Sequence, residues 1–137
     1  MVASFSLNEA FKYGSSIISL VIRSPIIPAY ESRIIKKKES TILDMGTGPG
    51  FPGLVLAIIG YKNVSLVDSN GKKINFVKSV SKKLDIKTNI FLSRIEKLNN
   101  EKFDFLTSRA VANLNKLFTY SHKFTNKDSV LIFLKGK

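Results

Sequence analysis

The stretch Thr41-Ile-Leu-Asp-Met-Gly-Thr-Gly-Pro-Gly-Phe-Pro-Gly53 decides the fold of this chain, because it predicts a buried strand that runs through a glycine-rich turn into a helix. Gly46, Gly48 and Gly50 can take positive φ and place no Cβ between the backbone and a ligand. Pro52 suits the first turn of the helix that follows. This pattern is typical of a turn that cradles a nucleotide-containing cofactor, and it assigns Gly46 and Gly48 to that site.

Two classes of cofactor compete for this turn. Gly48, Gly50 and Gly53 match the G-x-G-x-x-G fingerprint of dinucleotide-binding folds, so the glycine spacing alone leaves NAD and S-adenosylmethionine open. A pyrophosphate needs free backbone N–H groups at a helix N-terminus, whereas Pro49 and Pro52 have no N–H to offer. The turn therefore favours S-adenosylmethionine, which carries no phosphate.

Two carboxylates at the ends of predicted strands favour the same cofactor. Asp44 would attract the cationic ammonium and sulfonium groups of S-adenosylmethionine; its structural alternative is to brace the loop or cap the helix. Asp68 ends an apolar run that starts at Val64, about 20 residues after the glycine turn, where an acid can accept both ribose hydroxyls. Its structural alternative is to cap the helix that starts near Gly71.

The composition indicates one domain that is attracted to polyanions. The chain has 137 residues, of which 44% are hydrophobic, enough for a single core. Its 22 Lys and Arg residues against 10 Asp and Glu give a net charge of +12, which favours nucleic acid as a partner. The absence of cysteine excludes disulfides and cysteine-ligated zinc and fits a cytoplasmic location. No metal site is expected, and the apolar run Ile17–Ile22 is too short to span a membrane.

From residue 41 onwards, short apolar runs alternate with amphipathic stretches, which predicts an α/β fold with a parallel, doubly wound sheet. The predicted strands cover residues 41–45, 63–67, 88–92, 103–107 and 129–134, and the predicted helices cover 51–60, 71–84 and 113–122, with a turn around 94–99. We therefore expect a Rossmann-like domain over residues 41–137. Residues 1–40 are predicted to form a helical segment, which starts at the capping box Ser6–Glu9 and ends at Pro25, and a basic connector.

Five motifs, taken in order, resemble one protein family. They are Leu43-Asp-Met-Gly-Thr-Gly-Pro-Gly-Phe-Pro-Gly53, Leu66-Val-Asp-Ser-Asn-Gly-Lys-Lys-Ile-Asn-Phe76, Ser93-Arg-Ile-Glu96, Thr107-Ser-Arg-Ala-Val-Ala112 and Leu134-Lys-Gly136. Together they make residues 41–137 similar to the RsmG (GidB) family of bacterial 16S ribosomal RNA guanine-N7 methyltransferases. The resemblance implies a Rossmann-like methyltransferase that depends on S-adenosylmethionine, with 16S ribosomal RNA or the small ribosomal subunit as its partner.

The family's motifs also imply roles for individual residues. Gly46 and Phe51 would line the methionine end of the cofactor, and Ile95 and Glu96 would flank its adenine. Arg109 would lie at the cofactor and target site, and it is the one residue assigned to catalysis. Structural alternatives stay open, since Phe51 and Ile95 could be core residues and Glu96 a solvated charge.

Arg109 is also singled out by its place in the sequence. It follows the apolar run Phe103–Thr107 and is therefore expected at the carboxyl end of a strand, where ligands bind in open parallel sheets. A salt bridge to Asp104 or Asp44 is its structural alternative. The sequence alone does not separate the two.

The sequence lacks residues that other methyl acceptors would require, which fits guanine N7 as the predicted target. Guanine N7 has a free lone pair and no proton to lose, so its methylation needs positioning and no general base. Enzymes that methylate exocyclic amines commonly carry Asn or Asp followed by Pro-Pro-aromatic after the fourth strand, whereas this chain has Ser108-Arg-Ala110. An amine target is thus disfavoured, and carbon methylation through a cysteine adduct is excluded.

Members of the resembled family continue beyond the Leu-Lys-Gly motif into two more strands. We therefore expect the sheet here to lack its last strands, and the strand at 129–134 to be an exposed edge that invites self-association. Two other functions stay open. A non-catalytic RNA-binding remnant of the fold would account for the charge but not for the cofactor turn. An NAD-binding oxidoreductase fragment would account for the glycines but would need a substrate domain.

Overall fold

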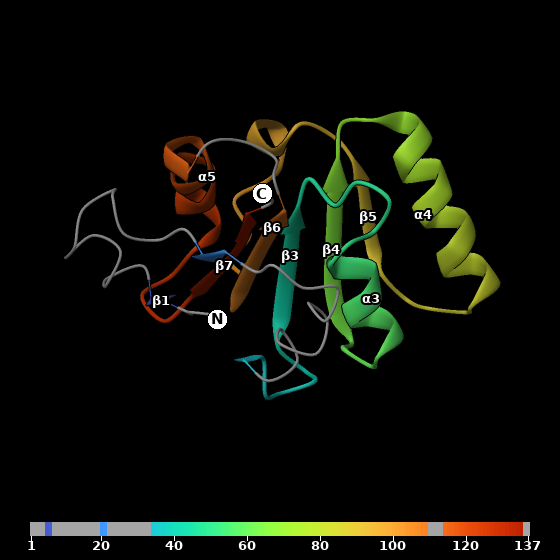
Figure 1. Cartoon of the computed structure of the whole chain (residues 1–137), viewed down its shortest axis with the longest axis horizontal. Coiled ribbons are helices and arrows are strands. Elements are labelled where there is room, and N and C mark those ends of the chain that lie inside the picture. Colours follow the sequence, from blue (N-terminus) through green and yellow to red (C-terminus); the bar gives the residue numbers. More distant parts are fainter. Residues whose placement is uncertain (1–4, 7–19, 22–33, 110–113, 136–137) are drawn as a thin grey trace.

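The structure is a computed structural model that describes residues 5–6, 20–21, 34–109 and 114–135 (Figure 1). Its centre is a sheet in which the five longer strands run parallel. The elements are β1 (Phe5–Ser6), β2 (Leu20–Val21), β3 (Thr41–Met45), α3 (Gly53–Ile58), β4 (Asn63–Asp68), α4 (Gly71–Lys83), β5 (Asn89–Leu92), the 3₁₀ helix η1 (Ile95–Lys97), β6 (Phe105–Arg109), α5 (Leu114–Ser121), the 3₁₀ helix η2 (His122–Phe124) and β7 (Val130–Lys135).

The five parallel strands follow the order β7-β6-β3-β4-β5. From β3 the chain moves outward to β4 and β5, and then returns to add β6 and β7 on the other side of β3. The reversal between β3 and β6 is the switch point of a doubly wound sheet, where the loops diverge and leave room for a ligand. The predicted α/β fold with a parallel, doubly wound sheet is confirmed.

Alternate residues of the central strand β3 face opposite sides of the sheet. Ile42 belongs to the core cluster that contains residues of α3 and α4, whereas Leu43 belongs to the cluster that contains Leu117 of α5. In Figure 1, α4 accordingly lies beside β5 and α5 lies at the β6–β7 side of the sheet. Because apolar side chains close both faces, β3 and β4 consist almost entirely of buried residues.

The outer edge of β7 is paired, so the prediction of an exposed fifth strand was wrong. β1 pairs antiparallel with Val130 and Leu131, and β2 pairs parallel with Leu134 and Lys135. Two short strands from the N-terminal part of the chain therefore satisfy backbone groups that were expected to stay open. The predicted self-association through this edge loses its basis.

The same two strands limit the helix predicted for the N-terminal part. Because Leu20–Val21 form a strand, a helix that begins at Ser6 does not continue to Pro25. The rest of that predicted helix lies outside the described residues, and the domain boundary at residue 40 stays a prediction. Within the part of the chain that the structure describes, no helix is long and apolar enough to cross a membrane.

Helix α3 lies very close to the sheet at Gly53. A Cβ at this position would lie 2.2 Å from Cδ2 of Leu66 and 2.7 Å from Oδ2 of Asp44. A protein interior is too tightly packed to absorb such an overlap without moving both strands. The last glycine of the motif is therefore required for the packing of the helix on the sheet.

We expect Gly53→Ala to lower the free energy of unfolding by about 2–3 kcal/mol, because the added methyl group overpacks this junction. Gly71→Ala is the matched control, since a Cβ at Gly71 would meet Cδ2 of Leu92 at 3.9 Å and alanine favours the helix that begins there. Urea denaturation measures both variants. Equal stability of the two would contradict the packing role of Gly53.

Candidate functional site

A cavity of about 600 Å³ opens at the carboxyl ends of β3, β4 and β6. Its volume lies within the range of roughly 300–1,000 Å³ that is typical of small-molecule sites. All seven residues predicted to bind the cofactor line it: Gly46, Gly48, Phe51, Asp68, Ile95, Glu96 and Arg109. The structure thus brings the predicted residues together, whereas their roles stay predictions.

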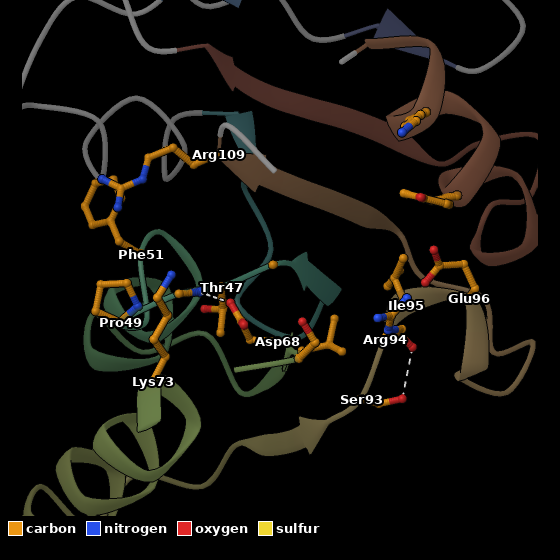
Figure 2. A pocket seen from close by; sticks show the side chains of 16 residues that line it. Thr47, Pro49, Phe51, Asp68, Lys73, Ser93, Arg94, Ile95, Glu96 and Arg109 are labelled. Carbon is orange, nitrogen blue, oxygen red and sulfur yellow. Dashed lines mark hydrogen bonds between the residues drawn. The ribbon is translucent and has the colours of Figure 1, made fainter. Parts of the chain in front are cut away.

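The cavity has two distinct ends, as Figure 2 shows. Phe51 and Arg109 lie at one end, and Ile95 and Glu96 lie at the other. Asp68 lies between them. A ligand that touches all of them must be extended.

The glycine-rich turn uses its own backbone N–H groups inside the protein. With the two prolines aside, every N–H from residue 47 to residue 54 donates to a protein oxygen. The bonds run from Thr47 to the Val67 carbonyl, from Gly48 to the Asp68 carboxylate, from Gly50 and Phe51 to the Thr47 carbonyl, from Gly53 to the Asp44 carboxylate and from Leu54 to the Gly50 carbonyl. A turn without free N–H groups forms no anion-binding nest, so it does not hold a pyrophosphate as dinucleotide-binding folds do.

The positive φ angles expected for the turn are present, at 68° for Gly46, 59° for Gly48 and 101° for Gly50. At Gly48, which lines the cavity, a Cβ would meet no atom within 4 Å. The backbone at Gly48 therefore has open space beside it at the wall of the cavity.

Asp68 joins the end of β4 to the glycine turn. Its carboxylate accepts the Gly48 N–H and the Asn70 N–H, each at 2.8 Å. Since each carboxylate oxygen can accept two hydrogen bonds, this half-exposed group retains capacity for hydroxyl donors. Asn70 caps α4 by accepting the Lys73 N–H, so the capping role considered for Asp68 is filled by its neighbour.

Asp44 does not line the cavity, which corrects the expectation that it attracts the cofactor. It is fully buried, and its oxygens accept the Gly53 N–H and the Thr107 hydroxyl, each at 2.8 Å. Burial raises the pKa of Asp44, and these hydrogen bonds offset part of that effect. Its role is to brace α3 and β6 against β3.

The Arg109 guanidinium lies 4.6 Å from the centroid of the Phe51 ring, in a cation–π contact. Among the described residues it forms no salt bridge with Asp104 or Asp44. Asp104 instead accepts the backbone N–H and the hydroxyl of Thr41. The structural alternative considered for Arg109 is thus not realised, and its exposed side chain lies at the cavity.

Other lining residues were not predicted, among them Lys73, Lys116 and Tyr120. The interaction with the Glu96 carboxylate raises the pKa of Tyr120. A backbone hydrogen bond and the contact with Tyr120 lower the pKa of Glu96. These residues lie on helices, and no pattern in the sequence marks the helix face that turns towards the cavity. The positions of Lys116 and Tyr120 depend on how α5 packs against the sheet.

A family model described as rRNA small subunit methyltransferase G (GidB) matches residues 28–137. The chain belongs to this family. The match begins upstream of residue 41, where the five motifs that carried the resemblance start.

Relatives in the methyltransferase G family are similar over most of this chain. The ribosomal RNA small subunit methyltransferase G of Orientia tsutsugamushi (strain Ikeda) is 44% identical over 103 residues, which cover 75% of this chain and 51% of that protein. The protein of the same name from Chlorobaculum tepidum is 40% identical over 140 residues, which cover 95% of this chain and 64% of that protein. The chain therefore spans between about half and two thirds of these relatives' length.

Solved methyltransferases share the fold of this family member. Coclaurine N-methyltransferase, in a structure bound to N-methylheliamine and SAH, superposes with a TM-score of 0.68 at 19% identity. The superposition covers 78% of this chain and 33% of that chain. The predicted Rossmann-like methyltransferase fold is confirmed.

The raised pKa of Asp44 predicts a pH-dependent stability. The folded chain binds this proton more tightly than the unfolded chain, so the contribution is complete below the usual value of 3.8 and is lost as the pH rises through the raised pKa. Asp44→Asn can still accept from Gly53 and can donate to the Thr107 oxygen without carrying a charge.

We therefore expect the stability of Asp44→Asn, relative to the wild type, to improve as the pH is raised from about 4 to about 8. The free energy of unfolding of both proteins, measured across this range, checks the prediction. Asp128→Asn, an exposed carboxylate, is the control for the change in charge. A difference that stays constant with pH would contradict the assignment to Asp44.

Proposed function

We propose that this chain binds S-adenosylmethionine in the cavity at the carboxyl ends of β3, β4 and β6. The observation that carries the proposal is that the backbone N–H groups of the glycine turn donate to oxygens of the protein itself. They are therefore not available to bind a pyrophosphate. The half-exposed Asp68 carboxylate beside that turn suits a ribose, whose hydroxyls are donors. The relatives' names and the SAH in the coclaurine N-methyltransferase structure support the same cofactor.

The two ends of the cavity suit the two ends of this cofactor. Arg109 offers a guanidinium to a carboxylate at the end where it covers Phe51, so we place the methionine moiety there. Ile95 offers an apolar, half-buried side chain at the other end, where we place the adenine. The bound cofactor would supply an electrophilic methyl group on its sulfonium, and the side chains would orient it.

We further propose that the methyl acceptor is a guanine N7 of the small-subunit ribosomal RNA. Four cationic side chains line the cavity against two acidic ones, although the cofactor is itself cationic. The cations are Lys73, Arg94, Arg109 and Lys116, and the acids are Asp68 and Glu96. An excess of positive charge around a cationic ligand suits a second, anionic component, and RNA phosphates provide it. Because N7 has no proton to lose, positioning of the base is sufficient.

Calorimetric titration tests the cofactor site. We expect the folded chain to bind S-adenosylmethionine saturably and to show no measurable binding of NAD. Asp68→Ala should weaken binding by about 10- to 100-fold, because the ribose hydroxyls lose a charged acceptor. Asp128→Ala, at an exposed loop position, should bind as the wild type does. A folded chain that does not bind S-adenosylmethionine would refute the proposal.

The salt dependence of binding to 16S ribosomal RNA fragments tests the RNA interface. We expect Arg94→Gln to lower the slope of log K against log salt by about one, because one phosphate contact is lost. Lys83→Gln is the control, since Lys83 is the last residue of α4 and does not line the cavity. Equal slopes for the two variants would argue against RNA contact at the cavity. Transfer of a labelled methyl group, mapped to guanine N7, would then test the chemistry itself.

A further inference from the structure

The loop that carries Ile95 and Glu96 has little support of its own. It follows β5, which is the edge strand of the described sheet beside β4. Its only regular element is η1, a single 3₁₀ turn whose N-terminus has no side-chain cap. One 3₁₀ turn is not stable in isolation, so the position of this loop depends on contacts with the rest of the protein.

Ile95 and Leu98 pack against the core cluster that contains Leu117 and Phe124, and Lys123 adds hydrogen bonds to the backbone of the loop. The half-buried ammonium group of Lys123 donates to the Glu96 carbonyl at 2.8 Å and to the Leu98 carbonyl at 2.7 Å. These two carbonyls lie at the end of η1, where a helix leaves its acceptors unpaired, so the ammonium group acts as a C-terminal cap. Lys123 is itself held, because its carbonyl accepts Lys102 Nζ at 2.9 Å and its ammonium lies 4.9 Å from the centroid of the Phe124 ring.

Tyr120 adds a second contact from the same part of the chain. It lies in the last turn of α5, three residues before Lys123, lines the same cavity as Glu96, and packs against the same core cluster as Ile95 and Leu98. The segment formed by α5 and η2 therefore holds this loop through the Glu96 backbone carbonyl and through packing against Ile95 and Leu98. We call these two residues, Tyr120 and Lys123, the latch.

We propose that the latch residues Lys123 and Tyr120 are positioning residues that hold the loop Ser93–Leu98 against the adenine end of S-adenosylmethionine. This inference rests on the proposed cofactor site. The methionine end has a different support, because Phe51 belongs to the closed glycine turn and Arg109 to β6. Loss of the latch should therefore weaken contacts at the adenine end and leave the methionine end intact.

Hydrogen exchange of the ligand-free chain tests the latch directly. Lys123→Met keeps the aliphatic stem and removes the donors, and we expect the amides of residues 94–98 to exchange about tenfold faster. Exchange within the glycine turn, residues 46–54, should not change. Lys127→Met, at an exposed position in the next loop, is the matched control. Unchanged exchange at residues 94–98 in the Lys123 variant would overturn the inference.

Two ligands separate the ends of the site. S-adenosylmethionine probes both ends, whereas 5′-methylthioadenosine has the adenosine without the amino-acid group. Lys123→Met should raise the Kd of both ligands about tenfold, and Tyr120→Phe should raise both less, because it removes only the phenol hydroxyl and keeps the ring that packs beside the loop. Phe51→Ala should raise the Kd of S-adenosylmethionine and leave that of the shorter ligand within about twofold.

Each outcome decides one of the two proposals. If the Lys123 variant binds both ligands as the Lys127 variant does, the positioning role is overturned. If the folded wild type binds neither ligand, the proposed cofactor site fails, and the exchange experiment still decides whether the latch holds the loop.

Discussion

The hydrogen bonds of the buried Asp44 carboxylate join β3 to β6 and to α3, the helix that follows the glycine turn. One oxygen accepts the Thr107 hydroxyl from β6, and the other accepts the Gly53 N–H from α3. The Thr107 bond joins β6 to β3 at the switch point, and the Gly53 bond ties the start of α3 to the end of β3, so together they fix the direction in which the glycine turn leaves the sheet. A buried carboxylate is costly unless its oxygens are paired, which requires α3 to come close enough for its first N–H to reach. That close approach is the reason why only glycine fits at Gly53.

The pairing of the glycine turn's backbone N–H groups within the protein also determines how a ligand can be recognised. Since the backbone N–H groups of residues 47–54 all donate to protein oxygens, prolines aside, the turn offers a ligand its shape and no backbone donor. Recognition then passes to side chains that arrive from other strands and loops, chiefly Asp68 and Arg109. Such a site suits a ligand with hydroxyl donors and a carboxylate, and it does not suit a pyrophosphate. A glycine motif that matches the dinucleotide fingerprint in its spacing therefore serves a different purpose here.

Much of this could be predicted from the sequence, because buried parallel strands appear as apolar runs and ligands gather where such strands end. The seven predicted site residues converge for that reason, since the topology of a parallel sheet brings the strand ends together regardless of which side chains they carry. The orientation of Asp44 could not be predicted, because an acid at a strand end can face the core or the cavity. The pairing of Phe5 with Leu131 could not be predicted either, since a strand of two residues has no period and its partner is far away in the chain. The latch depends on helix packing, which no local pattern encodes.

The two ends of the cavity differ in how firmly the fold supports them. Phe51 lies in the glycine turn, and Arg109 lies at the end of β6, a central strand of the sheet. Their cation–π contact links β6 directly to that turn. Ile95 and Glu96 lie on a single 3₁₀ turn beside an edge strand, held by hydrogen bonds from Lys123 of η2 and by packing of Ile95 against the core cluster that contains Leu117 of α5. Groups on central strands keep their positions more precisely than groups on loops. In the proposed orientation, the sulfonium methyl group is adjacent to the methionine moiety, so the end of the cavity formed by the glycine turn and β6 would surround the reacting atom. The adenine end needs only affinity, and a loop fastened by side chains is sufficient to provide it.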